Sequence, residues 1–335
     1  MRHAIIIGVA AILSASVYAA VRIPAEVSSK GALANVRIRV VDQDGRAVAD
    51  AKVWGGFTCG NLMNDYVLVD GMTDTNGMYV AKGKCNEFLR FDVRKEGYYH
   101  TEEKIYFGRS KADPIVVDGK WQPYGETRTV VLKRIRKPTP MSHIPRGILK
   151  IPAQGVWIGF DLELQSFVFP YGEGRMSDVL LRSNTDVVDV QTNFLTTLEV
   201  SFTNNLHAGF YLCKKDSFSE MKSEYAADTN ANFMAHCKYS LQRLGRFRSE
   251  ESLTDDSYMV FRTRTRVDEK GNLISANYGK IYGRWGFYRG MGTSGIWFNS
   301  EPNDTNLEDA ETARKSRLGY EKSLEFEKKR QQGGK

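Results

Sequence analysis

The sequence predicts an all-β protein with an N-terminal β-sandwich, a second β-rich domain and a charged C-terminal tail. Short segments alternate between apolar and polar residues, as half-buried strands do, and Asp-Gly and Asn-Gly pairs that favour tight turns lie between them. A proline-rich stretch then separates two such regions of the 335-residue chain. The predicted parts are the sandwich at residues 35–133, a linker at 134–152, the second domain at 153–302 and the tail at 303–335.

The first domain is expected to contain short strands joined by tight hairpin turns. Residues 36–41 alternate with period two, and Gln43-Asp44-Gly45 follows as a turn, because Asp and Gly tolerate positive φ. Asn76-Gly77 predicts a second turn of the same kind. The other strands are expected at residues 47–54, 67–72, 78–80, 88–93 and 127–132.

The order of these turns and strands resembles the carboxypeptidase regulatory-like domain, a transthyretin-like sandwich appended to many secreted bacterial proteins. The resemblance departs from the family pattern at Ala47, where Pro is usual. It implies a β-sandwich that serves as a stabilising or adhesive module, without catalysis of its own. The matching residues are Asp42, Gly45, Ala47, Val48, Asp50, Ala51, Val53, Thr73, Asp74, Asn76, Gly77, Gly97 and Tyr98.

The linker and the second domain follow. Pro138, Pro140, Pro145 and Pro152 disfavour regular pairing, so a solvated hinge is expected there. A short helix is expected at residues 217–227. Strands are expected at residues 156–163, 167–169, 198–202, 207–213, 258–267, 273–288 and 295–299.

The last segment, residues 309–335, is rich in charge and poor in apolar side chains, so we expect a frayed helix or a disordered tail. Parts of the second half resemble uncharacterised secreted bacterial proteins of the same two-domain layout. That resemblance implies a recurring arrangement and no activity. The stretches that carry it are residues 160–163, 170–174, 278–281 and 301–308.

The N-terminus predicts export. Arg2 and His3 precede an apolar run at residues 4–17, which is too short to span a bilayer with ease, and small residues surround Ala19. We therefore expect a signal peptide at residues 1–19 that is cleaved near Ala19, with an uncleaved anchor as the alternative. The mature chain is expected in the periplasm, at the cell surface or outside the cell, without a transmembrane span.

Four cysteines remain after export: Cys59, Cys85, Cys213 and Cys237. An even number in a chain bound for an oxidising compartment predicts disulfides. Three pairings are possible, and we favour Cys59–Cys85 with Cys213–Cys237 because each bond then stays inside one domain. A metal site made from all four is disfavoured, since no Cys-x-x-Cys spacing occurs.

The charge balance does not point to nucleic acid. The formal net charge of +7 is mild for this length and fits a solvated basic face. The sequence has neither a basic-aromatic RNA-binding signature nor zinc-finger spacing, so no nucleic-acid partner is expected.

No catalytic site is expected. A nucleophile triad is not supported, because the sequence has no Gly-x-Ser-x-Gly. Asp161 and Glu163 would share one face of a strand, and a glycosidase needs two converging acids, but solvent-facing acids on strands are far commoner. The histidines of the mature chain form no metal motif; they are His100, His143, His207 and His236.

Two kinds of binding residue are candidates. Asn303, Asp304 and Asn306 could offer oxygen ligands to calcium, but the late bidentate acid of a calcium loop is missing, so no metal or other cofactor is expected. Aromatic rings could stack on sugars, although core packing is the default in strand patterns. The aromatic candidates are Trp54, Tyr98, Tyr99, Trp121, Trp157, Trp285 and Trp297.

The sequence thus favours a secreted or periplasmic, non-catalytic structural or interaction module of the bacterial cell envelope. Its partner would be an envelope glycan or another envelope protein. A carbohydrate- or peptide-binding protein is the alternative, and an enzyme with a site in the second domain is a third hypothesis. An aromatic platform or groove would favour binding, whereas a cleft with converging acids or histidines would favour catalysis.

Overall fold

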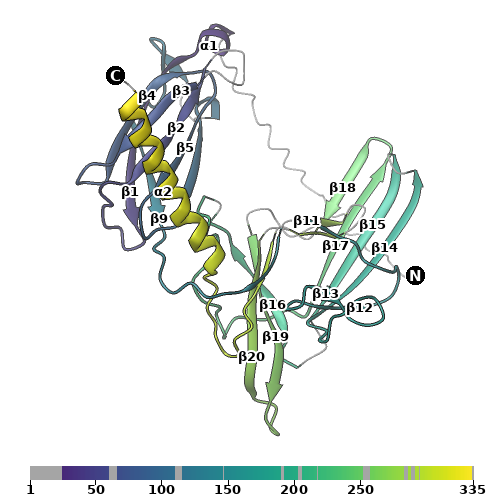
Figure 1. The fold of residues 1–335 in the computed structure, drawn as a ribbon. Helices are drawn as coiled ribbons and strands as arrows, with labels where there is room; N and C mark the ends of the chain where they lie inside the picture. Colours follow the sequence, from purple (N-terminus) through teal and green to yellow (C-terminus); the bar gives the residue numbers. More distant parts are fainter. Residues whose placement is uncertain are drawn as a thin grey trace, which may run out of the picture.

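The computed structural model describes residues 25–333 except 60–65, 110–114, 146, 190–191, 203–205, 217, 252–256, 283–285, 288–290 and 294. The predicted signal peptide and Trp285 lie outside the described residues. The fold is mainly β and divides into two domains, which confirms the predicted fold class (Figure 1). In the part of the chain that the structure covers, no helix is both long and apolar enough to cross a membrane.

The first domain packs two sheets face to face around one core. Inward residues of β1 and β2, such as Val36, Ile38, Val53 and Phe57, are fully buried. A short helix, α1 (Ala25–Lys30), precedes the sheets. One sheet contains β4 (Met78–Cys85), β1 (Ala32–Asp42), β8 (Lys120–Trp121), β7 (Val116–Val117) and β9 (Glu126–Leu132); the other contains β3 (Tyr66–Met72), β2 (Lys52–Thr58), β5 (Phe88–Arg94) and β6 (Thr101–Tyr106).

The two predicted turns form, but they link the sheets and do not close hairpins. Gly45 and Gly77 have φ of +78° and +71°, as the turn chemistry requires. Asp74 Oδ1 accepts the amides of Asn76 and Met78, at 2.9 and 2.8 Å. Each turn carries the chain from one sheet to the other, because β1 pairs with β4 and β9 while β2 pairs with β3 and β5.

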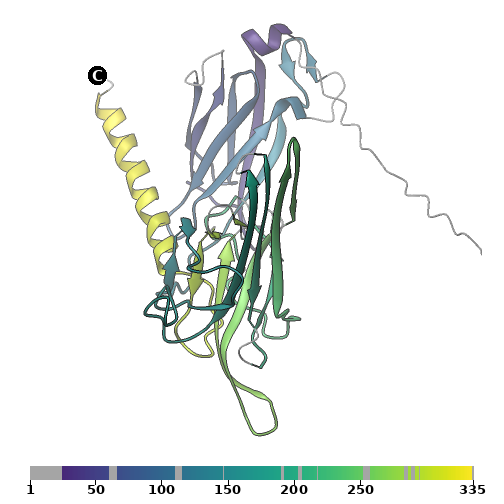
Figure 2. The same cartoon turned by 90° about the vertical axis from the view of Figure 1, so that its right-hand side faces the viewer.

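The second domain contains three sheets, two of which enclose its main core (Figure 2). Phe160, Leu198, Phe261 and Phe298 meet there, all nearly fully buried. The strands are β13 (Ser166–Phe167), β12 (Ile158–Asp161), β14 (Val179–Asp189), β15 (Asn193–Ser201), β17 (His236–Leu244) and β18 (Phe247–Glu251) in one sheet; β10 (Ser142–Ile144), β23 (Ile296–Phe298), β20 (Leu273–Tyr282), β19 (Ser257–Val267) and β16 (Gly209–Lys214) in the next; and β11 (Gly147–Leu149), β22 (Met291–Thr293) and β21 (Gly286–Phe287) in the third.

The prolines at residues 138–152 do not make a solvated hinge. β10 lies between them and pairs with β23, and β11 pairs with β22, so this segment belongs to the second domain's sheets. The prolines lie outside these short strands, where their missing amide protons cost no ladder hydrogen bond. The prediction of a linker at residues 134–152 was therefore wrong for most of its length.

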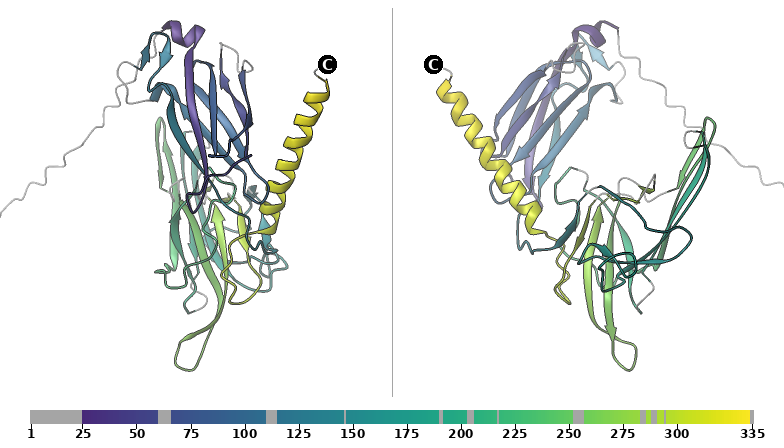
Figure 3. Two further views of the ribbon diagram at one scale, coloured as in Figure 1. Left: turned by 90° about the vertical axis from the view of Figure 1, so that its left-hand side faces the viewer. Right: turned by 45° about the vertical axis from the view of Figure 1, so that its right-hand side comes forward.

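The charged tail is an ordered helix. α2 (Ala310–Gly333) leaves the second domain and runs back along the first, toward the end of that domain where α1 lies (Figures 1 and 3). The expectation of a frayed or disordered tail was wrong, because the charges of α2 are matched by charges on the sandwich that the sequence does not reveal as neighbours. Lys52 with Glu327, and Asp70 with Arg330, are two such pairs.

The predicted disulfides are not formed, since all four cysteines are free. Cys85 Sγ donates to the Phe88 carbonyl at 3.2 Å. Cys213 lies on β16 and Cys237 on β17, in different sheets, so that a bond between them would have to cross the domain. Burial raises the pKa of Cys85 and that of Cys237 to about 12, so both stay protonated thiols at neutral pH.

Candidate functional site

The outer face of the β3-β2-β5-β6 sheet carries an open hollow. Residues of β2 alternate, so Val53, Gly55 and Phe57 face the core while Trp54 and Gly56 face outward. Trp54 is 42% exposed and lines a hollow of about 370 Å³ together with Gly56, Leu68, Arg90 and Glu102.

Glycine creates this hollow. Gly56 lies directly opposite Leu68 on β3 and Arg90 on β5, and it offers no side chain to fill the space between them. Arg90 is held at the rim by an ion pair of 2.7 Å to Glu102. The indole of Trp54 therefore stands beside a hollow that the buried backbone of Gly56 also lines, with Arg90 and Glu102 along one margin.

Helix α2 closes one end of the face. A second hollow, of about 260 Å³, lies between the sheet and the helix and shares Trp54 with the first. Phe326 of α2 lines it and is itself 59% exposed. The helix and the strand thus present Trp54, Leu68 and Phe326 as partly exposed apolar side chains around connected space.

A buried ion cluster attaches α2 at this end. Lys52 is 2% exposed and contacts Asp70 at 2.5 Å and Glu327 at 2.8 Å, while Arg330 of the helix pairs with Asp70. Burial opposes the charge of Lys52, but the hydrogen bonds to Asp70 and Glu327 outweigh it, so the pKa of Lys52 is raised.

The other end of the face is closed by the second domain. His100 Nε2 lies 3.2 Å from Asp92, and His100 Nδ1 lies 3.2 Å from Glu220, which also accepts the Ser316 hydroxyl of α2. Burial lowers the pKa of His100, but hydrogen bonds to the two carboxylates outweigh it and raise that pKa to about 9. His100 is therefore a cation at neutral pH, shared by both domains and the helix.

The segment expected as a helix at residues 217–227 forms bends and isolated β-bridges in its described part. Its backbone pairs elsewhere: Glu102 N donates to Phe218 O at 2.9 Å, and Glu220 N donates to His100 O at 2.9 Å. These bonds lie along the edge strand β6, so a loop of the second domain pairs with the sheet of the first domain.

The centre of the interface is the carboxylate of Glu308, which is 1% exposed. It accepts the Tyr99 hydroxyl at 3.0 Å and the amides of Arg136 and Lys137 at 2.6 Å each. Nearby, the buried amine of Lys280 donates to Leu307 O and to Asp309, at 2.6 and 3.1 Å. A solvated hinge between two domains was the wrong expectation, because these buried charges join sandwich, second domain and tail.

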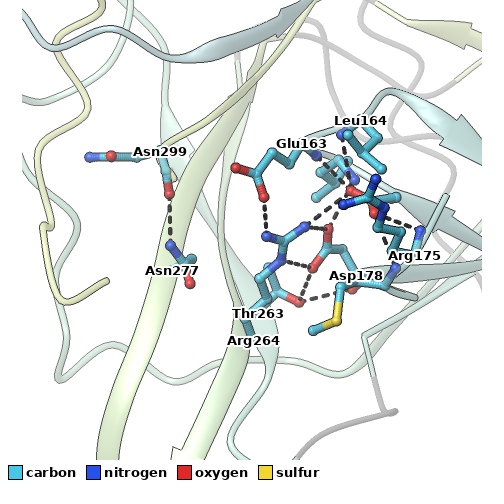
Figure 4. A network of polar contacts seen from close by, with 11 residues as sticks. Glu163, Leu164, Arg175, Asp178, Thr263, Arg264, Asn277 and Asn299 are labelled. Atoms are coloured by element: carbon cyan, nitrogen blue, oxygen red, sulfur yellow. Dashed lines mark hydrogen bonds and ion pairs between the residues drawn. The ribbon is translucent and has the colours of Figure 1, made fainter. Parts of the chain in front are cut away.

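The predicted acid pair is part of another buried cluster. Arg264 pairs with Asp161 at 3.1 Å, with Asp178 at 2.8 Å and with Glu163 (Figure 4). Arg264 has φ of 50° at an irregularity in the β19–β20 pairing, and its guanidinium reaches the six-stranded sheet from there. Asp161 and Glu163 are therefore engaged by one cation, and the cluster ties two sheets together.

Burial and hydrogen bonding act differently on these acids. Burial opposes ionisation of Asp161, but the backbone amides of Leu164, Arg175 and Met176 outweigh it and lower its pKa. Burial dominates at Asp178, whose pKa is raised. The arrangement holds carboxylates against arginine and leaves little room for a substrate between them.

The remaining predicted residues also have structural partners. His143 stacks on Trp297, with ring centroids 4.4 Å apart, and contacts Glu311 at 3.1 Å. His207 Nε2 lies 2.8 Å from the Gly271 carbonyl. His236 opens β17 and is exposed.

The calcium candidates make hydrogen bonds within the second domain and, at Asn306, to the segment that follows the sandwich. Asn303 Oδ1 accepts the Ala276 amide, and Asp304 Oδ2 accepts the Asn299 side-chain amide, both at 3.1 Å. Asn306 Oδ1 accepts the Glu308 amide, and its Nδ2 donates to Lys137 O. Among the described residues, no group of three or more His, Cys, Asp or Glu side chains is placed to hold a metal ion.

Of the aromatic candidates, Trp54 and Trp157 are partly exposed, at 42% and 39%, and they lie in different domains. Trp121 and Trp297 are core residues, Tyr99 is bonded to Glu308, and Tyr98 packs under Arg134. Alternation within residues 47–54 could have placed Trp54 outward. No sequence signal pairs Lys52 with Glu327 or His100 with Glu220.

The described residues thus define a mainly β protein of two joined domains with one open, Trp-lined face. The sequence matches no family model and no curated protein. Solved structures with partial likeness include 3-chlorocatechol 1,2-dioxygenase from Rhodococcus opacus 1CP, with 17% identity and a TM-score of 0.25 over 32% of this chain and 62% of that one.

Two further likenesses are of similar strength. Catechol 1,2-dioxygenase from Acinetobacter radioresistens has 14% identity and a TM-score of 0.25 over 34% of this chain and 55% of that one. A streptococcal ancillary pilin has 10% identity and a TM-score of 0.22 over 83% of this chain and 61% of that one. This chain therefore spans less than two thirds of each of these proteins, and the likenesses carry no argument about its activity.

Proposed function

We propose that this chain is an exported, non-catalytic binding module of the bacterial cell envelope, whose ligand-binding surface is the Trp54 face of the first domain. The resemblance of residues 35–133 to the carboxypeptidase regulatory-like domain supports an adhesive sandwich. The observation that carries the proposal is the hollow in which an exposed indole stands beside the bare backbone of Gly56. Concave, apolar sites with a few polar groups at the rim are the usual form of a binding site.

The ligand class that fits this face is an envelope glycan. A sugar ring offers an apolar face to the indole, and hydroxyls that can reach Arg90 and Glu102 at the rim. Lys52, His100 and Arg264 are engaged with buried carboxylates, which supports binding over catalysis as the role of this chain.

Sedimentation with purified peptidoglycan sacculi tests the proposal. The full chain should co-sediment, and Trp54→Ala should weaken binding about tenfold or more, as loss of a central aromatic anchor does. Trp157→Ala is the matched control, since Trp157 is exposed to a similar degree but lies in the other domain, against Arg182.

The outcomes separate the hypotheses. Equal loss in the two variants would show that the Trp54 face is not the binding surface. Failure of the unaltered chain to co-sediment would refute glycan binding. In that case another envelope protein becomes the candidate, and cross-linking from an introduced residue beside Leu68 would test it.

A further inference from the structure

The free end of the six-stranded sheet carries a group of exposed apolar side chains. Val188 is 80% exposed and Phe247 is 59% exposed, and neighbouring side chains are open to solvent as well. Monomeric soluble proteins seldom expose such contiguous groups without a role. The five residues, which we call the sheet tip, are Val187, Val188, Leu195, Leu244 and Phe247.

Strand register brings the tip together. β14 and β15 form one hairpin and β17 and β18 another, and Leu244 lies directly opposite Phe247 across the second turn. Gly245 N donates to Thr192 O at 2.5 Å, which fastens the two turns to each other. The tip projects beyond the rest of the second domain (Figures 1 and 3).

Apolar residues lie on both faces of the tip. Leu244 and Phe247 share one face with Leu195, because Leu244 pairs with Asn193 and side chains alternate along β15. Val187 pairs with Phe194 and lies on the opposite face. A folded protein partner would cover the apolar side chains on one face and leave those on the other face exposed to water. The headgroup region of a lipid bilayer would cover the apolar side chains on both faces.

The charges nearest the Leu244–Phe247 turn fit an anionic surface. Arg243, Arg246 and Arg248 are exposed beside the apolar pair, whereas the acidic residues at positions 250 and 251 lie farther along β18 and Asp186 and Asp189 lie on the neighbouring hairpin. Asp189 Oδ1 accepts hydrogen bonds from the Thr192 amide and hydroxyl, at 2.7 and 2.8 Å. Arginines next to partly exposed Phe and Leu form the usual pattern of proteins that enter the headgroup region.

Addition of a second copy at the strand edge is a weaker reading of the same feature. β18 is the edge of its sheet, but it is five residues long and has charged residues at positions 248, 250 and 251. Short, charged edges disfavour pairing with another chain.

We propose that the sheet tip is a peripheral membrane contact that binds anionic phospholipid. Phe247, Leu244 and Val188 enter the boundary between headgroups and acyl chains, and the arginines contact lipid phosphates. This contact is separate from the Trp54 face and goes beyond the proposed function. It would hold the chain at a membrane surface while the first domain stays free to bind.

Vesicle sedimentation of the full chain tests the proposal. The chain should bind vesicles of phosphatidylglycerol mixed with phosphatidylethanolamine, and bind vesicles of phosphatidylcholine at least about tenfold more weakly. Phe247→Ser should reduce binding about fivefold or more, because binding scales with the apolar area inserted. Phe169→Ser is the matched control: Phe169 is 86% exposed, follows β13 at the opposite end of the sheet, and should change nothing.

A second measurement guards against loss of folding. In Phe247→Trp, tryptophan emission should shift to the blue on anionic vesicles, and brominated lipids should quench it. No binding by the unaltered chain, equal effects of the two serine variants, or no spectral change in Phe247→Trp would each overturn the proposal. Trp54→Ala should bind vesicles normally, so failure here and failure at the glycan site are distinguishable.

Discussion

Replacing Gly77 with Ala is a direct test of how the first domain joins its sheets. The Gly77 carbonyl accepts the Val40 amide at 2.7 Å, and its φ is +71°. An added Cβ would lie 2.4 Å from the Val40 carbonyl oxygen and 3.1 Å from the Val48 nitrogen. Those two atoms are hydrogen-bonded to each other at 3.0 Å, so the methyl group would enter an existing bond.

Two costs add for this variant. A residue with a Cβ at positive φ costs about 1–2 kcal/mol. Moving the Val40 carbonyl leaves the buried Val48 amide without its partner, which costs about 1–3 kcal/mol more. We therefore expect Gly77→Ala to lower the free energy of unfolding by about 2–5 kcal/mol.

Gly45→Ala separates the two costs. Gly45 has φ of +78°, but no atom lies within 4 Å of an added Cβ, so only the backbone cost of about 1–2 kcal/mol applies. Urea unfolding of the full chain, followed by tryptophan fluorescence, measures both, since Trp121 lies in the sandwich core. Equal destabilisation by the two variants would refute the steric reasoning, and an unchanged midpoint for Gly77→Ala would refute the turn itself.

Four further predictions concern charges, thiols and export. The folded pKa of His100 is raised to about 9, so its stabilising contribution is complete below about pH 6.5 and is lost as pH rises through 9; melting temperatures across pH 6–9 should fall less in His100→Gln than in the unaltered chain. Lys280→Ala should cost about 3–5 kcal/mol in urea unfolding because it leaves Asp309 buried without its cation, and adding Asp309→Asn should recover part of that loss. Thiol titration should find four free cysteines in denatured protein and fewer reactive ones in native protein at pH 8; disulfide-linked peptides would contradict the structure. N-terminal sequencing of exported protein should begin near Ala20, whereas an intact Met1 in a membrane fraction would contradict cleavage.

Local patterns in the sequence predicted strands and turns well. Period-two alternation located β1, β5 and β9, and the Asp44-Gly45 and Asn76-Gly77 pairs located the positive φ of Gly45 and Gly77. The same patterns did not show that the turns change sheets. A turn's local chemistry determines its φ angles, but the partner of the next strand depends on distant residues.

The candidate site was only partly predictable for the same reason. The outward position of Trp54 follows from alternation, yet the hollow exists because Gly56 lies between Leu68 and Arg90, which is a matter of strand register. The tail was misjudged because composition does not distinguish a charged helix that faces only solvent from one whose charges pair with buried residues of another domain. Cysteine count predicted disulfides, although the positions of Cys213 and Cys237 in separate sheets depend on topology.

The return of α2 to the first domain has a consequence for biosynthesis. Lys52 is buried between Asp70 of the sandwich and Glu327, a residue 275 positions later in the chain, so the sandwich emerges long before the second carboxylate partner of its lysine. Until Glu327 arrives, the buried Lys52 has only Asp70 as its carboxylate partner. A variant that lacks α2 would keep this incomplete ion cluster on the outer sheet.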